Sequence, residues 1–320
     1  MALELVDAAA EAGADAVKFQ TFRAESLITR TAPKAPYHTE TTGPDEKQSW
    51  FELLKTQELT RDMHVAILER CAQRGVLFMS TPYDNDSVDL LDDLDIALYK
   101  VASTDANNTP FLEYMASKGR PIILSTAMCT LDEVTASVAA IRAAGVDDLL
   151  VMQCTGSYPA PVNEANLHAM TSIAEACTVA VGYSDHTPGM EAAIAATALG
   201  ASAYEKHFTL DRNLPGPDHR ASLEPGELID LVRAVRTTEA ALGDGVKRVM
   251  PCEEINRQRL RKSILAKRDI AAGEVISLDD LAIKRAGGLG LSPDRYSDVV
   301  GRRAGRTITL EHPITLEDLD

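Results

Sequence analysis

Two stretches with the composition of β-strands carry a histidine at their ends, and the two histidines lie 21 residues apart. Residues 179–186 end in His186, residues 203–210 contain His207, and a helical pattern lies between them. A strand–helix–strand unit makes its strands parallel neighbours, so both imidazoles should emerge at the same carboxyl-terminal edge. Two histidines at the edge where α/β enzymes keep their active sites indicate a divalent metal site. On spacing alone, two unrelated histidines explain the pattern equally well.

Two lysines interrupt other strand-like segments. Lys18 lies within Val-Lys-Phe-Gln and Lys100 within Tyr-Lys-Val-Ala-Ser, where alternation would point both side chains to the inside of a closed sheet. A buried ammonium costs several kcal/mol unless an anion or hydrogen bonds compensate it. The two lysines therefore indicate a clamp for phosphate or carboxylate. The alternative is that each lysine reaches solvent or pairs with a carboxylate of the protein.

Other polar side chains follow the same strands. Glu205 and His207 share one face of a strand, so the carboxylate could orient a group beside the metal or bind substrate hydroxyls. Residues 211–219 form a proline-rich loop with Asp218, which is either part of the site or a surface turn. Hydroxyls at strand ends can bind phosphate oxygens, although capping the next helix is their commoner role. We expect His38, His64, His168 and His312 to be surface residues.

The bulk composition excludes several classes of protein. The 320 residues carry a net charge of −16 and the isoelectric point is about 4.9, which argues against nucleic acid and anionic membranes as partners. Five widely spaced cysteines without a CxxC motif indicate a reducing compartment, and we expect a cytoplasmic protein. No apolar run reaches the roughly 20 residues that span a membrane, and we see no signal peptide.

Strand and helix patterns alternate through the first part of the chain, which predicts a parallel sheet. A helix over residues 3–12 comes first, and seven strand-like runs follow. A (β/α)₈ barrel has eight strands, each followed by a helix, so we predict a TIM barrel whose first strand is missing. An open doubly wound sheet is the alternative. The strand-like runs are 15–21, 76–81, 97–103, 121–126, 148–155, 179–184 and 203–209.

We expect three segments in the domain organisation. Residues 1–245 form the barrel, residues 246–262 a charge-rich linker that follows Gly243 and Gly245, and residues 263–320 a small domain with short β-like pieces at 264–266, 283–285 and 307–309. About 58 residues make a marginal core on their own. The small domain should therefore lean on another surface, either its own barrel or a partner chain.

Several long motifs resemble the sialic acid synthase family. They are residues 17–20 (Val-Lys-Phe-Gln), 183–187 (Tyr-Ser-Asp-His-Thr), 205–212 (Glu-Lys-His-Phe-Thr-Leu-Asp-Arg), 216–219 (Gly-Pro-Asp-His) and the Cys-Thr-Gly-Ser-Tyr-Pro-Ala-Pro run of 154–161. Ile-Lys-Arg at 283–285, with Ser-Pro at 292–293, resembles the C-terminal antifreeze-like (SAF) domain of that family, which has a β-clip fold. The resemblance covers essentially the whole chain.

The resemblance implies an enzyme that condenses phosphoenolpyruvate with N-acetylmannosamine or a related 2-acetamido sugar. The products would be a nine-carbon sialic-type 2-keto acid and phosphate, with Mn²⁺ (or Mg²⁺ or Co²⁺) as cofactor. It also implies a domain-swapped homodimer, in which the small domain of one chain covers the barrel of the other. His186 and His207 would hold the metal, Glu205 and Asp218 would contact the sugar, and Arg285 would reach the N-acetyl group from the partner. The phosphoenolpyruvate pocket would consist of Lys18, Thr81, Lys100, Ser103, Ser125, Tyr158 and Ser184.

Two departures from the family pattern qualify this assignment. The family begins with a strand resembling Glu-Ile-Gly-x-Asn-His-x-Gly, which this sequence lacks, and Ala286 stands where relatives usually have proline. If that strand is truly absent, we expect very low synthase activity and exposed strand edges at the gap. The alternatives are a pseudaminic acid synthase, an aldolase that forms a Schiff base through Lys100 or Lys18, and an impaired homologue that only binds metal and phosphoenolpyruvate.

Overall fold

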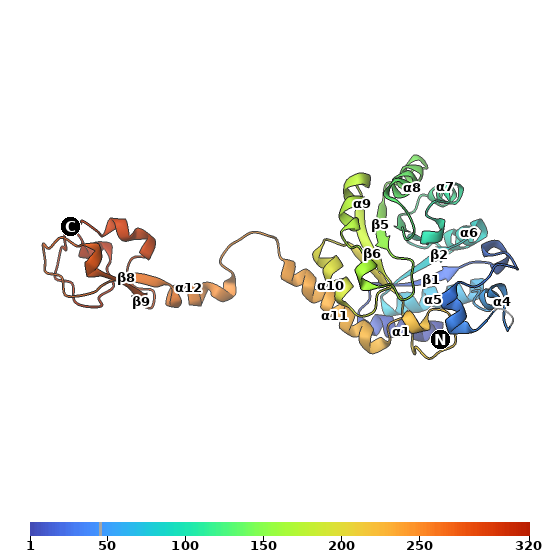
Figure 1. Ribbon diagram of the computed structural model, residues 1–320, viewed down its shortest axis with the longest axis horizontal. Helices are drawn as coiled ribbons and strands as arrows, with labels where there is room; N and C mark the ends of the chain where they lie inside the picture. The colour runs from blue at the N-terminus through green and yellow to red at the C-terminus, as the bar shows by residue number, and fades with distance from the viewer. Residues whose placement is uncertain (45–46) are drawn as a thin grey trace. The chain divides into compact units, whose positions relative to one another are not determined.

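The computed structural model describes residues 1–44 and 47–320, which form two compact units, Met1–Gly243 and Asp244–Asp320. In the large unit, seven parallel strands pair in chain order and curl into a half-barrel (Figure 1). Each predicted strand overlaps an observed one, so the expected barrel-type sheet is confirmed. The strands are β1 (Ala16–Thr21), β2 (Leu77–Pro82), β3 (Tyr99–Val101), β4 (Ile122–Ser125), β5 (Leu149–Cys154), β6 (Ala180–Asp185) and β7 (Ala203–Lys206).

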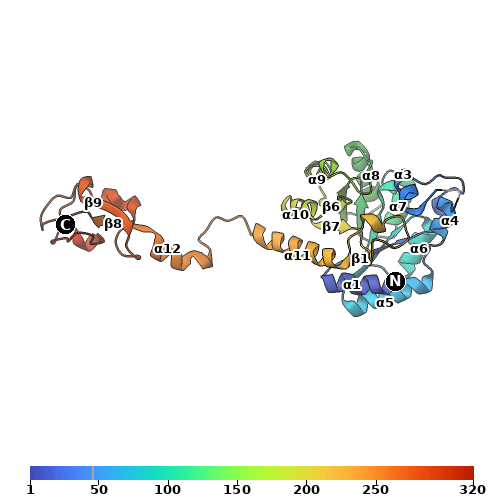
Figure 2. The same ribbon diagram turned by 60° about the horizontal axis from the view of Figure 1, so that its bottom comes forward.

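Helices cover the convex face of the sheet, and α1 packs against both α5 and α11 (Figure 2). The helix layer thus continues past the two outer strands, although no described strand lies between β7 and β1. The half-barrel therefore has the helix layer of an eight-fold barrel and one strand fewer. The helices are α1 (Ala2–Ala12), α5 (Arg61–Arg74), α6 (Asn85–Asp93), α7 (Thr109–Ala116), α8 (Leu131–Ala143), α9 (Ala169–Cys177), α10 (Glu191–Ala198) and α11 (Pro225–Leu242), and the β1–α5 connection adds α2 (Ala24–Leu27), α3 (Pro36–Thr42) and α4 (Trp50–Lys55).

Local sequence explains where the main helices begin and end. The Thr130 side chain accepts a hydrogen bond from the Glu133 amide, and the Glu133 carboxylate accepts one from the Thr130 amide, which makes a capping box at the start of α8. Gly13 ends α1 with φ of 82°, a left-handed conformation that glycine adopts without a steric penalty.

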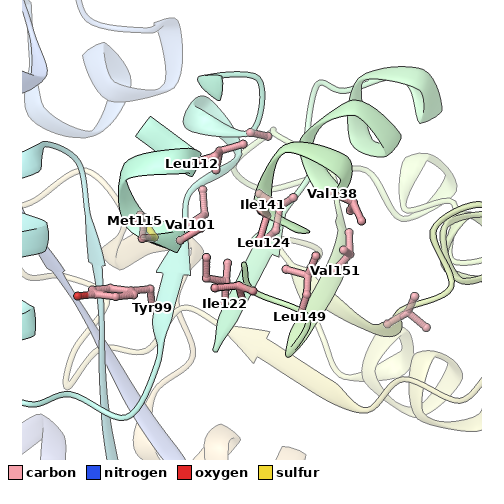
Figure 3. Close-up of a cluster of buried hydrophobic side chains, with 14 of the residues drawn as sticks. Tyr99, Val101, Leu112, Met115, Ile122, Leu124, Val138, Ile141, Leu149 and Val151 are labelled. Atoms are coloured by element: carbon pink, nitrogen blue, oxygen red, sulfur yellow. The ribbon is translucent and has the colours of Figure 1, made fainter. Parts of the chain in front are cut away.

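The core lies between the sheet and its helices. Tyr99 and Val101 of β3 meet buried side chains of β4, β5, α7 and α8 in one apolar layer (Figure 3). Burial of each large aliphatic side chain contributes about 1.5–3 kcal/mol relative to exposure. Because side chains alternate along a strand, Lys100 lies on the opposite face of β3 from Tyr99 and Val101. The core thereby fixes which strand residues face the inside of the half-barrel.

Two of the four histidines that we expected on the surface are buried. His38 stacks on Trp50 with ring centroids 4.1 Å apart. His64 of α5 lies 2.8 Å from the Thr60 carbonyl oxygen through Nδ1 and 2.8 Å from the Thr21 hydroxyl through Nε2. Those two partners satisfy both ring nitrogens, which is why this imidazole can be buried at the end of β1. The prediction for His64 failed because Thr21, 43 residues earlier in the chain, is brought to the ring only by the tertiary structure.

The small unit contains an antiparallel pair of strands, β8 (Lys262–Ala266) and β9 (Leu281–Arg285), and its helix α12 spans Glu254–Leu260. Its core is a compact apolar cluster. The predicted piece at 307–309 is no strand, because it pairs only through an isolated bridge between Ile270 and Ile308. Within residues 1–44 and 47–320, no helix combines the length and apolar character needed to cross a membrane. The core cluster is Ile264, Ala266, Ile270, Ile276, Val299, Ala304, Ile308, Ile314 and Leu319.

Substitution of Gly182 should destabilise the half-barrel. A Cβ atom at Gly182 would lie 2.6 Å from the Ala203 carbonyl oxygen, so Gly182→Ala must push β6 and β7 apart. We expect a loss of about 1–3 kcal/mol in the free energy of unfolding, measured by urea denaturation. Gly226→Ala in α11 is the matched control, because a Cβ there meets nothing within 4 Å. Equal stability of the two variants would contradict the close approach.

Candidate active site

The parallel pairing of β6 with β7 places the two histidines side by side. The register sets Ser184 opposite Glu205 and Asp185 opposite Lys206. His186 and His207 come next along the two strands, and their rings stack with centroids 5.3 Å apart. The spacing of the two histidines in the sequence, which could have been accidental, therefore produces a true pair.

The surroundings of His186 select one nitrogen for binding. Its Nδ1 lies 2.7 Å from the Thr155 carbonyl oxygen and donates to it, which leaves the Nε2 lone pair available. The ring of Tyr158, next to a cis bond to Pro159, packs on the His186 imidazole at 4.0 Å between centroids and lies edge-on to His207 at 5.5 Å.

Both imidazoles are neutral at physiological pH. Burial lowers the pKa of His207 to about 3, and the nearby ammonium of Lys18 acts in the same direction. Burial also lowers the pKa of His186, against the opposing effect of its hydrogen bond to Thr155. Neutral imidazole is the form that binds metal ions, so the pair fits a divalent cation. The described residues contain no group of three or more His, Cys, Asp or Glu suited to a metal, so other positions would fall to water or substrate.

A cluster of three charges lies beside the histidines. Lys18 Nζ donates to Glu205 Oε1 at 2.8 Å, and Lys100 Nζ lies 3.6 Å from Glu205 Oε2. Burial alone would raise the pKa of Glu205, but the ammoniums of Lys100 and Lys18 outweigh it and hold the pKa below its usual range. Burial lowers the pKa of Lys100 to about 8, with Glu205 opposing the shift. Both lysines thus point inward as predicted, and a carboxylate of the protein already pairs with them.

Hydroxyl groups connect this cluster to neighbouring strands. Ser125 of β4 accepts a hydrogen bond of 2.6 Å from Lys100 Nζ, and Ser184 donates one of 3.1 Å to Glu205 Oε1. Ser103, just after β3, accepts a bond of 2.9 Å from the Ala127 amide. Thr81 is buried at the end of β2. Ser125 and Ser184 therefore hold charged groups in place, whereas Ser103 ties two loops together.

The loop after β7 brings Asp218 into the electrostatic field of the cluster. Burial raises the pKa of Asp218, and the positive Lys18 opposes the shift. The neighbouring His219 is hydrogen-bonded to the Thr209 hydroxyl at 2.7 Å, which fixes the end of the loop. Arg285, by contrast, is an exposed residue of β9 in the small unit.

A cavity of about 540 Å³ lies between β1 and β7 and extends to α1 and α11. Its apolar part is lined by side chains such as Leu5, Val17 and Leu231. Its volume is that of a small-molecule pocket, and it occupies the place where an eighth strand would lie. Five predicted site residues line its polar part, namely Lys18, Ser184, His186, Glu205 and His207.

Sequence reasoning missed a second charged group behind the histidines. Lys206 Nζ pairs with Asp185 Oδ2 at 2.7 Å, and the Tyr204 hydroxyl donates to the same oxygen at 2.5 Å. The signal was present, because a charged residue directly precedes each histidine. It was overlooked because alternation places these side chains on the opposite face of the strands.

Comparison with known proteins gives a consistent set of relatives. The profile of the NeuB family matches residues 5–247, and that of the SAF domain matches residues 261–320. The chain is 42% identical over 306 residues to an N,N'-diacetyllegionaminic acid synthase of Campylobacter jejuni, covering 95% of this chain and 91% of that enzyme. A pseudaminic acid synthase from the same species is 33% identical, over 96% of this chain and 89% of that enzyme.

Solved structures agree with this result. The crystal structure of an N-acetylneuraminic acid synthetase from Leptospira borgpetersenii, in complex with citrate, superposes with a TM-score of 0.71 at 30% identity. The match covers 80% of this chain and 84% of that chain.

Removal of the central carboxylate should destabilise the protein. Glu205→Gln would leave Lys18 and Lys100 close together without an anion, and loss of one partner from a buried pair costs about 3 kcal/mol. We expect a correspondingly lower stability in urea denaturation, partly restored in the double variant Lys100→Met/Glu205→Gln. Glu25→Gln, which breaks the exposed pair with Lys55, is the control and should change little. Stability of Glu205→Gln equal to wild type would refute the shared role of Glu205.

Proposed function

The chain belongs to the NeuB family, and from this premise we propose that it condenses phosphoenolpyruvate with N-acetylmannosamine or a related 2-acetamido sugar. The products would be a nine-carbon sialic-type 2-keto acid and inorganic phosphate. The observation that carries the proposal is the position of two inward lysines directly beside a pair of neutral histidines. Such a site offers cationic binding for an acid and a separate place for a Lewis acid.

The lysines suit phosphoenolpyruvate because that substrate carries both a carboxylate and a phosphate. Lys18 and Lys100 would bind these groups, and Ser125 and Ser184 would hold Lys100 and Glu205 in position. Thr81, Ser103 and Tyr158 complete the proposed pocket. During the reaction C3 of phosphoenolpyruvate bonds to the sugar aldehyde carbon, water adds at C2, and phosphate leaves.

The histidine pair would hold Mn²⁺, or Mg²⁺ or Co²⁺, through His186 and His207. Such an ion, when bound, polarises the carbonyl oxygen of the open-chain sugar. Glu205 and Asp218 would contact the sugar hydroxyls, and the raised pKa of Asp218 makes that residue the better proton donor of the two. All five cysteines are free thiols, which supports the proposed cytoplasmic location.

The acetyl group of the sugar would be recognised by Arg285 of a partner chain in a domain-swapped homodimer. Charge supports this arrangement. The small unit has nearly equal numbers of acidic and basic residues, so all of the net negative charge falls on the large unit. A small unit with an exposed cation such as Arg285 is thus complementary to the large unit of a second copy.

An assay of the product by mass tests the proposed reaction. Phosphoenolpyruvate, Mn²⁺ and a panel of 2-acetamido sugars should give phosphate and a nine-carbon keto acid, and the mass identifies the sugar. His207→Ala should abolish metal-dependent turnover, because it removes one of the two proposed metal ligands. The fold of this variant, measured by circular dichroism, should stay intact. Unchanged turnover in that variant would contradict the assignment of His207 as a metal ligand.

Three other outcomes separate the alternatives. Product only from a 2,4-diacetamido sugar of the pseudaminate type would indicate a pseudaminic acid synthase. The lowered pKa of Lys100, about 8, is also what a Schiff-base lysine needs, so covalent trapping of pyruvate by borohydride would indicate an aldolase instead. Binding of Mn²⁺ and phosphoenolpyruvate without product would indicate an impaired homologue.

Mixing two inactive variants tests the swapped homodimer. His207→Ala should inactivate the barrel and Arg285→Ala the small domain, but in a mixed dimer one site would combine the intact barrel of one chain with the intact small domain of the other. Random pairing of equal amounts, after dissociation and reassembly, should restore about a quarter of wild-type activity. Each variant mixed with itself is the control. No recovery from a mixture that has exchanged subunits would exclude sites shared between chains.

A further inference from the structure

We propose that the buried ion pair between Asp185 and Lys206 is the positioning device of the histidine pair, setting the distance and the orientation of the His186 and His207 rings. The two residues are opposite each other in the register of β6 and β7, and each directly precedes one of the histidines. The inference rests on the proposed metal-dependent function and adds positioning residues to it.

The pair is one of the most buried charged groups in the large unit. Only 3% of the Lys206 side chain and none of the Asp185 side chain is exposed, and Lys206 Nζ lies 2.7 Å from Asp185 Oδ2. Asp185 Oδ2 also accepts the Tyr204 hydroxyl at 2.5 Å, and Asp185 Oδ1 accepts the Thr187 amide at 2.7 Å. Lys206 Nζ makes a second bond to the Thr187 carbonyl oxygen. Every strong hydrogen-bonding group of the pair is therefore directed at β6, β7 or the residue after His186.

These contacts enclose the backbone of His186 from both sides. Asp185, a member of the ion pair, precedes this histidine. Thr187 follows it and is hydrogen-bonded to Asp185 through its amide and to Lys206 through its carbonyl oxygen. The His186 carbonyl oxygen accepts the Ala160 amide at 2.8 Å, and the His207 carbonyl oxygen accepts the Leu223 amide at 2.9 Å. Neither histidine can shift along its strand without breaking a charged contact or a backbone hydrogen bond.

The presence of an ion pair at this position is better explained by its effect on the alignment of β6 and β7 than by a contribution to folding stability. Desolvation of two charges offsets most of their attraction, and well-packed apolar residues stabilise such a position at least as well. Apolar side chains would tolerate sliding of one strand past the other, whereas opposite charges with directed hydrogen bonds would not. If one strand slipped by a single residue, its histidine would turn to the opposite face of the sheet and the histidine pair would be lost, because the side chains of a strand alternate between its faces.

Metal affinity in three variants tests the proposal. Lys206→Met breaks the pair, and the double variant Asp185→Asn/Lys206→Met removes both charges. Arg120→Met breaks the partly buried pair with Asp92. Arg120 lies before the amino-terminal end of β4, whereas the histidines follow the carboxyl ends of β6 and β7. Mn²⁺ binding by calorimetry and melting temperature are measured for each full-length chain. We expect the Mn²⁺ dissociation constant to rise about tenfold or more in both Lys206 variants and to stay within about twofold in Arg120→Met.

The double variant separates positioning from simple stability, because it leaves no buried unpaired charge. Its melting temperature should recover while its Mn²⁺ affinity does not. Affinity that recovers together with the melting temperature would overturn the proposal. If Lys206→Met does not fold, Tyr204→Phe removes one hydrogen bond to Asp185, and wild-type affinity in that variant would equally overturn it.

Absence of Mn²⁺ binding by the wild-type chain would contradict the proposed function and not the positioning role. If the wild-type chain binds no Mn²⁺, the metal site fails, and the positioning role is then judged from the imidazole signals of His186 and His207 in nuclear magnetic resonance spectra. Shifted signals in the double variant, with unchanged signals in Arg120→Met, support positioning without metal. Identical signals in wild type and the double variant overturn it.

Discussion

The register between β6 and β7 is the constraint on which the site depends. It creates three successive cross-strand pairs of different chemistry: the Ser184–Glu205 hydrogen bond, the Asp185–Lys206 ion pair and the stacked rings of His186 and His207. Because side chains alternate along a strand, the second pair lies on the other face of β6 and β7 from the first and third pairs. Gly182, two residues before Ser184, lets the two backbones approach closely enough for this register.

Charge balance is the second requirement of the site. Glu205 is shared between Lys18 and Lys100, which come from β1 and β3, so one carboxylate links three strands of the half-barrel. The same arrangement leaves two cations with only one anion between them, and Lys18 of this group lines the cavity. An anionic ligand would therefore complete the neutralisation that the protein alone leaves unfinished.

The outer face of the sheet provides the apolar core that stabilises the fold, and the inner face carries the polar groups of the site. Tyr99, Val101 and their apolar neighbours pack outward against the helices, and Lys100 between them points inward. The helix layer continues across α1 and α11, so the cavity between β1 and β7 has an apolar wall on the helix side and a polar end near the histidines. The fold thus supplies both a rigid wall and a place for charged ligands.

The sequence by itself determined the seven strands, the barrel-type sheet and the inward direction of the two lysines, because these follow from local periodicity and alternation. It could not determine what those lysines contact, since Glu205 lies more than a hundred residues from Lys100 and is joined to it only by folding. Nor could it find the burial of His64. A charged residue before each histidine was visible in the sequence, but only the structure shows that Asp185 and Lys206 pair with each other. Those depend on which strands become neighbours and in which register, and only the tertiary structure fixes both.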